Sequence, residues 1–204
     1  MNDMSNKWIG QSTIRPDGVD KVTGRAQYGA DGTMPGMIWG KVLRSPNPHA
    51  IIKSIDTSKA EKLPGVKAVV TRADFVDFPV DKPVPLGIQD MRWMARNVMA
   101  REKALFHGHP VAAVAAINEE VAAAACALIE VEYEVLPHVI EINDAIKPDA
   151  PILHDFAKFE GKPSNIVGTQ SFKAGDLDAG FAEADVIVER SFDTRPIHQG
   201  YIEP

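Results

Sequence analysis

The chain of 204 residues has the length of one large domain, or of one small domain and part of a second. Hydrophobic residues make up 45% of it and charged residues 25%, which are ordinary proportions for a globular protein. The net charge is −6 and the sequence has no basic run, which argues against nucleic acid as a partner because phosphate binding needs a basic face.

Cysteine usage and the first residues exclude further classes. Cys126 is the single cysteine, so the chain has no internal disulfide and no Cys-x-x-Cys pair for zinc or an iron–sulfur cluster. It lies in an alanine-rich run, where we expect a buried thiol. The polar N-terminus carries no signal peptide, and no stretch of about 18 apolar residues could span a bilayer. We therefore expect a cytoplasmic location and no membrane partner.

The chain opens with frequent glycine and proline. Residues 1–36 show little periodicity, which predicts an extended arm with turns. Met37–Leu43 and Ile51–Asp56 are apolar or β-branched runs and predict two strands. Ser58 and Glu61 then fit a capping box, in which the serine hydroxyl and the glutamate satisfy backbone amides at the start of a short helix.

A third predicted strand, Lys67–Thr71, is followed by a break in the rhythm. Residues 74–100 hold several prolines and predict a long loop, because proline denies a backbone donor. Met91, Trp93 and Met94 crowd its second half. Two interpretations stay open: these side chains cover the core of the same domain, or they contact another subunit.

The next segments predict a compact α/β unit. Val111–Ile117 is almost wholly apolar, as expected of a strand covered on both faces. Asn118 is placed to cap the helix that follows, with two glutamates in its first turn. Glu130–Val135 alternates glutamate with apolar residues, so one face of this strand is expected to be exposed.

A glycine- and proline-containing segment then predicts a linker at residues 147–164. A second unit is expected to begin after it. We predict a strand near Ile166–Phe172, a helix near Leu177–Ala184 and a strand at Val186–Phe192.

Few residues suggest chemistry of their own. His107 and His109 flank a glycine and could hold a metal, but no further ligands follow at a suitable spacing, so we expect no metal site. No dinucleotide-binding glycine pattern, phosphate loop or nucleophile elbow is present. Arg44, Ser45 and His49 lie beside a strand end and have two interpretations. One is turn chemistry, with Arg44 paired to a local carboxylate, and the other is contact with neighbouring domains. We favour the first.

Five blocks together resemble the molybdenum-binding subunit of the xanthine dehydrogenase and aldehyde oxidase family. They are Asp20–Asp31, Leu43–Ala50, Phe106–Ala116, Ile129–Pro137 and His198–Pro204. The order and spacing of the blocks are the specific signal, since no single block is diagnostic. The chain also resembles the subunits of bacterial enzymes of the 4-hydroxybenzoyl-CoA reductase type.

The resemblance implies an α/β (α+β) fold with an alpha/beta hammerhead domain over residues 37–146. The beginning of a molybdopterin-binding domain would follow at residues 165–204. In the full complex the cofactor would be molybdopterin cytosine dinucleotide, not carried by this chain, with 2Fe-2S clusters and FAD on partner chains. The implied partners are an iron–sulfur subunit, an FAD subunit and the rest of the molybdenum subunit.

The catalytic glutamate and the glycine-rich cofactor loop of the family lie further along than this sequence extends, so the resemblance implies no catalytic residue here. Glu203 is not expected to be that base, because a base must reach the proton it removes. The possible subunit contacts are Arg44, Ser45, His49, Met91, Trp93, Met94, His198, Gln199, Tyr201 and Glu203.

Three functional hypotheses follow. The chain is the N-terminal component of a molybdenum-dependent hydroxylase, dehydrogenase or 4-hydroxybenzoyl-CoA reductase-like enzyme, and is inactive alone. Alternatively, it is a non-catalytic interaction module of a split or degenerate molybdenum subunit. The third hypothesis is a fragment without activity. All three predict no turnover by the isolated chain.

Overall fold

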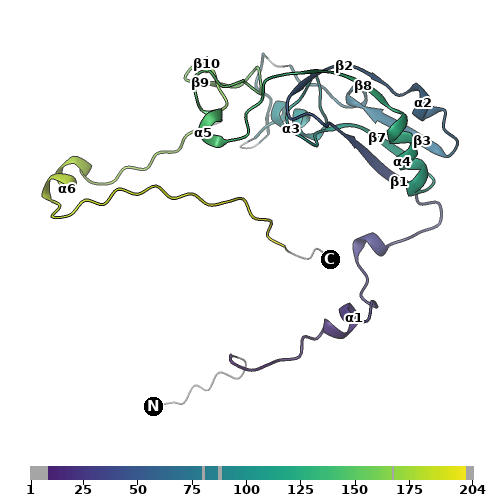
Figure 1. Cartoon of the computed structure of the whole chain (residues 1–204), viewed down its shortest axis with the longest axis horizontal. Coiled ribbons are helices and arrows are strands. Elements are labelled where there is room, and N and C mark those ends of the chain that lie inside the picture. The colour runs from purple at the N-terminus through teal and green to yellow at the C-terminus, as the bar shows by residue number, and fades with distance from the viewer. Residues whose placement is uncertain (1–8, 80, 87–88, 167, 201–204) are drawn as a thin grey trace. The chain divides into compact units, whose positions relative to one another are not determined.

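The computed structural model describes residues 9–79, 81–86, 89–166 and 168–200. The chain divides into two units, one of Met37–Gly175 and one of Met1–Gly36 together with Asp176–Pro204. Sheets and core lie in the first of these units (Figure 1). The arm predicted before it contains two short helical segments, α1 (Gly18–Val22) and η1 (Gly29–Asp31).

Two three-stranded antiparallel sheets form the framework of the larger unit. The first has the order β1-β7-β3, with β1 at Trp39–Arg44, β7 at Pro110–Ala116 and β3 at Val66–Thr71. The second has the order β6-β2-β8, with β6 at Lys103–Ala104, β2 at Ala50–Asp56 and β8 at Glu130–Val135. The five longer strands were all predicted from the sequence to within two residues at each end, and this mixed α/β architecture confirms the fold class.

The central strand β7 is covered on both faces, as its apolar sequence predicts. Ala112 and Val114 pack in one core cluster with α4 (Glu119–Leu128), while Val111 packs in a second cluster with Ile52 of β2. Neighbouring residues of a strand point to opposite faces, so β7 separates the two clusters. Small side chains in β7 and α4 let helix and strand approach closely and bury Cys126, which is 7% exposed. Burial raises the pKa of its thiol.

The caps of two helices show where local chemistry is readable. Asn118 precedes α4 and accepts a hydrogen bond from the Val121 amide at 2.8 Å, which confirms the predicted cap. The capping box at α2 (Ser58–Glu61) is wrong by one residue. Thr57 occupies the N-cap position and Ser58 is already the first helical residue. The Ser58 amide donates to the Asp56 side chain, so an aspartate before the helix accepts this hydrogen bond.

Residues 74–100 are not the continuous loop that the sequence predicts. They start at the last residue of η2 (Arg72–Asp74) and contain the hairpin of β4 (Pro85–Leu86) and β5 (Gln89–Asp90) and helix α3 (Met91–Val98). Asp90 caps α3 by accepting from the Arg92 amide at 2.9 Å. The buried side of α3 includes arginine rather than an unbroken apolar stripe, and this mixture hid the helical period.

The segment predicted as a linker folds against the larger unit. After α5 (Ile142–Ala145), the hairpin of β9 (Lys158–Phe159) and β10 (Lys162–Pro163) follows. Asn165 ties this region together: its Nδ2 donates to two carbonyls at 3.0 Å and its Oδ1 accepts from the Leu153 amide at 3.1 Å. Where the hammerhead domain ends and the next domain begins stays a prediction.

In the smaller unit the predicted helix is present as α6 (Leu177–Glu183), capped by Asp176. The strands predicted before and after it are both wrong as far as the described residues reach: 168–172, which belong to the larger unit, and 186–192 form no ladder. A strand needs a neighbour for its backbone groups, and none of the described residues supplies one here. Phe192 is 90% exposed. None of the helices in the described part of the chain is long and apolar enough to cross a membrane.

Candidate functional site

Arg44 and Ser45 lie where β1 ends and the turn to β2 begins, and this turn contacts the loop before β7. The Ser45 hydroxyl donates to the Asn47 carbonyl at 2.9 Å and accepts from the Asn47 amide at 3.1 Å, as turn chemistry predicts. Arg44 donates to the Gly108 carbonyl at 2.9 Å. The expected pairing with a carboxylate is wrong, because a backbone oxygen across the turn takes its place.

His49 is buried at the other end of this turn, at 3% exposure. Its Nδ1 lies 2.7 Å from the Pro137 carbonyl, which can only accept, so Nδ1 carries a proton and donates. The Leu136 amide donates to the His49 carbonyl at 2.9 Å. Among the described residues, its Nε2 has no hydrogen-bond partner. The ring therefore fastens the end of β8 to the start of β2.

His107 and His109 do not form a pair. His107 is exposed, whereas His109 is fully buried, stacks on Phe106 at 4.3 Å and accepts from the Leu105 amide at Nδ1. Burial lowers the pKa of His109, although nearby backbone carbonyls at the end of α3 oppose this. It is a neutral packing residue. No group of three or more potential metal ligands occurs among the described residues.

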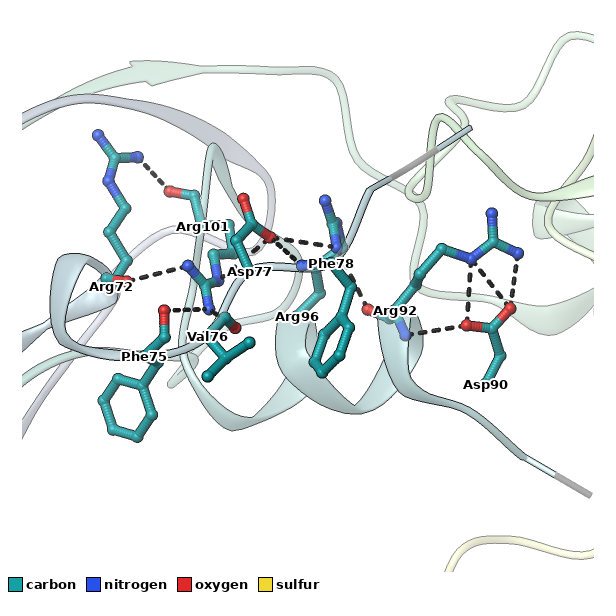
Figure 2. Close-up of polar contacts among 9 residues, drawn as sticks. All are labelled: Arg72, Phe75, Val76, Asp77, Phe78, Asp90, Arg92, Arg96 and Arg101. Carbon is teal, nitrogen blue, oxygen red and sulfur yellow. Dashed lines mark hydrogen bonds and ion pairs between the residues drawn. The ribbon is translucent and has the colours of Figure 1, made fainter. Parts of the chain in front are cut away.

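A cluster of arginines holds the region that the sequence predicted as a loop (Figure 2). Arg101 has only 7% of its side chain exposed, and its guanidinium donates to the carbonyls of Arg72, Phe75 and Val76. Arg72 in turn donates to the Arg101 carbonyl. These contacts fix the backbone of η2 and the residues after it to the segment that follows α3.

Arg92 forms the best-paired ion pair of the cluster. Its guanidinium contacts both oxygens of Asp90, the closest at 2.6 Å, and Figure 2 shows the two-pronged arrangement. The hydrogen bonds from the Arg92 side chain are the main cause that lowers the pKa of Asp90 to about 2. The Asp90 carboxylate thus both caps α3 and pairs with Arg92.

Arg96 is poorly paired by comparison. Its side chain is 9% exposed, its ion pair with Asp77 measures 3.9 Å, and it donates to the Arg92 carbonyl at a long 3.4 Å. Asp77 also lies 4.0 Å from Arg101 Nε and is itself 57% exposed. One exposed carboxylate is therefore shared between two buried guanidiniums.

A cleft of about 650 Å³ opens beside this cluster. Residues from α3, the segment around β6 and the loop before β9 line it: Asp81, Pro83, Arg92, Arg96, Arg101, Glu102, Lys103, Leu105, Leu153, His154, Asp155, Phe156 and Lys158. Trp93 fixes the loop on one side, with ring centroids 4.2 Å from His154 and 4.9 Å from Phe156. Burial, aided by Lys103 and Arg96, lowers the pKa of His154 to about 4.

The starts of three helices are not free to bind the pyrophosphate of a pterin dinucleotide. Binding a pyrophosphate at a helix start requires free backbone amides. The starts of α3, α4 and α6 are instead occupied by the side chains of Asp90, Asn118 and Asp176. Two of these are carboxylates, which repel phosphate. No catalytic step is therefore assigned to these helix ends.

The remaining predicted contacts lie on two elements. Met91, Trp93 and Met94 are on α3, where Met94 is 37% exposed and Trp93 packs within the same unit. His198 and Gln199 are exposed, while Tyr201 and Glu203 lie outside the described residues. Sequence reasoning missed Arg96 and Arg101; the recurrence of arginine at positions 92, 96 and 101 was the available signal.

The region of sheets and core also matches a family model, described as "Aldehyde oxidase and xanthine dehydrogenase, a/b hammerhead domain", over residues 23–137. That range is more than half of the chain. The chain belongs to this family. The resemblance stated from its motifs is thereby confirmed, as is the hammerhead fold.

Relatives in the family are 31–38% identical over nearly the whole chain. The chain is 38% identical to a probable xanthine dehydrogenase component of Bacillus subtilis, covering 94% of itself and 24% of that protein. It is 37% identical to the carbon monoxide dehydrogenase large chain of Afipia carboxidovorans, with 96% and 24% covered. It is 31% identical to the nicotinate dehydrogenase large molybdopterin subunit of Eubacterium barkeri, and this match covers 96% of the chain and 43% of that protein.

Solved structures of the family agree in fold. The quinoline 2-oxidoreductase of Pseudomonas putida 86 matches with a TM-score of 0.65 and 33% identity, over 86% of this chain and 22% of that one. The Cu,Mo-CO dehydrogenase matches with a TM-score of 0.64 and 37% identity, over 87% and 23%. The chain thus spans about a quarter of most of these relatives, and it corresponds to the hammerhead portion of their sequences. Family members use a molybdopterin cofactor and are subunits of larger complexes.

Proposed function

We propose that this chain is a docking and scaffolding part of a molybdenum oxidoreductase and that it does not turn over substrate alone. The observation that carries this proposal is the family match: it falls on the hammerhead domain, while the chain spans only 24% of its Bacillus subtilis relative. In the proposed enzyme, the catalytic glutamate and the glycine-rich cofactor loop lie outside the matched sequence. The reaction class would be hydroxylation, or reductive dehydroxylation, at a carbon centre.

The proposed cofactor of the assembled enzyme is molybdopterin cytosine dinucleotide, bound outside this chain. The proposed 2Fe-2S clusters and FAD belong to partner chains. A cluster of this kind needs several thiolates, whereas the one cysteine here is buried and its thiol has a raised pKa. We propose the cytoplasm as the compartment of the assembled enzyme.

Docking to the other subunits would use exposed apolar surface. Val186, Val188 and Phe192 are 72–90% exposed, an arrangement that a folded partner would cover. Met94 on α3 is a second proposed contact, together with His198 and Gln199, and Tyr201 and Glu203 complete this set. Arg44, Ser45 and His49 remain proposed only as contacts through their backbone and turn, because their side chains already have partners within the chain.

The alternative, an interaction module of a split molybdenum subunit, is supported by one comparison. The chain spans 43% of the Eubacterium barkeri protein but 24% of the Bacillus subtilis one, so molybdenum subunits of the family differ in length. A split subunit predicts that a second, separate chain completes the molybdenum site.

Purification decides between these functions. The chain is produced alone and together with the products of neighbouring genes, and molybdenum and iron are measured by mass spectrometry. We expect neither metal on the isolated chain and co-purification with a larger molybdenum-containing or iron–sulfur chain. Stoichiometric molybdenum on the isolated chain would contradict the proposal. Activity restored by mixing it with a second purified chain would favour the split subunit.

A further inference from the structure

The cleft beside α3 has an uneven charge distribution. Most of its cations are largely withdrawn from solvent: the side chain of Arg92 is 11% exposed, that of Arg96 9% and that of Lys103 15%. Lys158, at the edge of the cleft, is exposed. Its carboxylates sit at the exposed rim, as the 81% exposed Asp155 illustrates. Positive charge is thus held at the inner surface, where a lower dielectric strengthens any attraction to an anion.

Arg96 is the buried cation of the cleft with the weakest compensation: besides one long ion pair it has the Phe156 ring, whose centroid lies 5.3 Å from its Cζ. A buried charge is normally paired and hydrogen-bonded, because removing it from water costs free energy. Its carboxylate lies 3.9 Å away and is shared with Arg101, whereas a good guanidinium–carboxylate bond is roughly 2.7–2.9 Å long. Within the described part of the chain, the two buried guanidiniums therefore lack about one negative charge between them, and a monoanion would supply it.

A second polar group in the cleft also lacks a partner. His154 Nδ1 is buried and makes no hydrogen bond with the described residues. The imidazole is neutral near pH 7, so its tautomer can adapt to a donor or an acceptor. A ligand atom at this position would satisfy it.

Apolar surface and volume complete the description of the cleft. Leu105, Leu153 and Phe156 line it beside the cations. The volume of 650 Å³ lies within the range of roughly 300–1,000 Å³ that is usual for small-molecule sites. Such sites combine apolar walls with a few placed polar groups, and this one has that composition.

We propose that this cleft is a binding site for a small organic monocarboxylate, with the carboxylate against Arg96 and the apolar body against Leu105 and Phe156. The site does not depend on the molybdenum chemistry proposed above. It lies within the unit of Met37–Gly175, and every side chain it uses belongs to this chain.

Binding of a carboxylate in the cleft would change the pKa of His154. The charged groups around its ring are Lys103, Arg96 and Asp155, and the two cations lower its pKa while the aspartate raises it. A bound carboxylate offsets the charge of those cations, so the pKa of His154 rises above its value of about 4 in the protein without ligand. Loss of burial would also raise this pKa, so the diagnostic readout is a rise that occurs with a carboxylate ligand and not with its uncharged analogue.

Calorimetric titration of the 204-residue chain with benzoate tests the site, with benzamide as the uncharged ligand of the same shape. We expect benzoate to bind and benzamide to bind at least tenfold more weakly. Arg96→Gln keeps a long polar side chain but removes the charge, and it should weaken benzoate roughly ten- to a hundredfold. Lys53→Gln makes the same charge change on the exposed face of β2 and should leave binding unchanged. NMR titration of His154 should show the raised pKa with benzoate and not with benzamide.

Several outcomes would overturn the proposal. They are equal binding of benzoate and benzamide, unchanged affinity in Arg96→Gln, or inorganic phosphate binding more tightly than benzoate. Binding of a hexaglutamate peptide without binding of benzoate would assign the cleft to an acidic protein segment instead. If circular dichroism shows Arg96→Gln to be unfolded, Lys103→Gln replaces it. Its expected loss is several-fold, and an unchanged affinity there also contradicts the site.

Discussion

The layer of β7 and α4 and the arginine cluster around α3 are stabilised in opposite ways. In the first, alanine and valine are buried against one another, and the pattern of apolar residues alone is enough to specify it. In the second, buried guanidiniums donate to particular carbonyl oxygens of the chain. Burial is spread over many contacts, whereas directed hydrogen bonds concentrate stability in a few atoms. Single substitutions should therefore separate the two regions clearly.

The largest effect is expected from Arg101→Met. This change keeps the apolar stem but removes a buried guanidinium, and with it the hydrogen bonds to the carbonyls of Arg72, Phe75 and Val76. We expect a loss of about 3 kcal/mol in the free energy of unfolding, measured by urea denaturation. Arg15→Met, at a side chain that is 64% exposed, should leave the free energy of unfolding essentially unchanged. A loss below about 1 kcal/mol for Arg101→Met would show that the cluster is not stabilised as described.

Gly65→Ala tests the sheet and helix layer through its backbone. Gly65 has φ of +95°, and an added Cβ would lie 2.9 Å from Ile117 Cδ1. Strain and the displaced side chain together should cost about 2 kcal/mol. Gly40→Ala in β1 has open space around the new methyl group and is the matched control, with a thermal midpoint that does not fall. Equal midpoints for both variants would contradict the strain.

Asn118→Ala removes the cap of α4 and leaves the Val121 amide without its acceptor. The expected loss is about 1 kcal/mol, measured by urea denaturation. Asn118→Ser retains a side-chain oxygen at the same position and should recover most of this loss. No recovery with serine would mean that the asparagine acts by something other than capping.

His154→Gln should have the smallest effect, and one that depends on pH. The pKa of His154 is lowered to about 4 from 6.5, so between these values the unfolded chain binds more protons and stability falls as the pH falls. Because solvent screens the partly exposed ring, protonation of His154 should lower the free energy of unfolding by less than about 1 kcal/mol. The difference between the two proteins should change across pH 6.5 to 4 and be constant above about pH 7.5. A constant difference throughout would show that the pKa of His154 is the same in the folded and the unfolded chain.

The contrast also explains what the sequence could predict. The five longer strands, α4 and its cap at Asn118 follow from local periodicity and side-chain type, because the same residues that form them also bury them. The strands expected at 166–172 and 186–192 depended on neighbours that local sequence cannot supply. Helix α3 escaped notice because Arg92 and Arg96 take positions where apolar residues would be expected.

The candidate site was less predictable than the fold. Its residues come from positions 81 to 158, and no single motif contains them. His154 belongs to no recognisable motif, and its place beside Trp93 depends on a loop folding back on α3. Long-range contacts of this kind are invisible to local patterns. The turn at Ser45, by contrast, was readable because serine and asparagine hydrogen-bond their own backbone.

The fastening of β8 at His49 has a mechanical consequence. The two strands are antiparallel, so the end of β8 lies beside the start of β2. Tension between residues 49 and 136 would therefore separate the paired residues of the two strands one pair after another. The His49 ring and backbone bear that tension first, through their contacts with Pro137 and Leu136. If a bound partner pulls on the chain beyond β8, the contacts of His49 would resist the separation of β8 from β2.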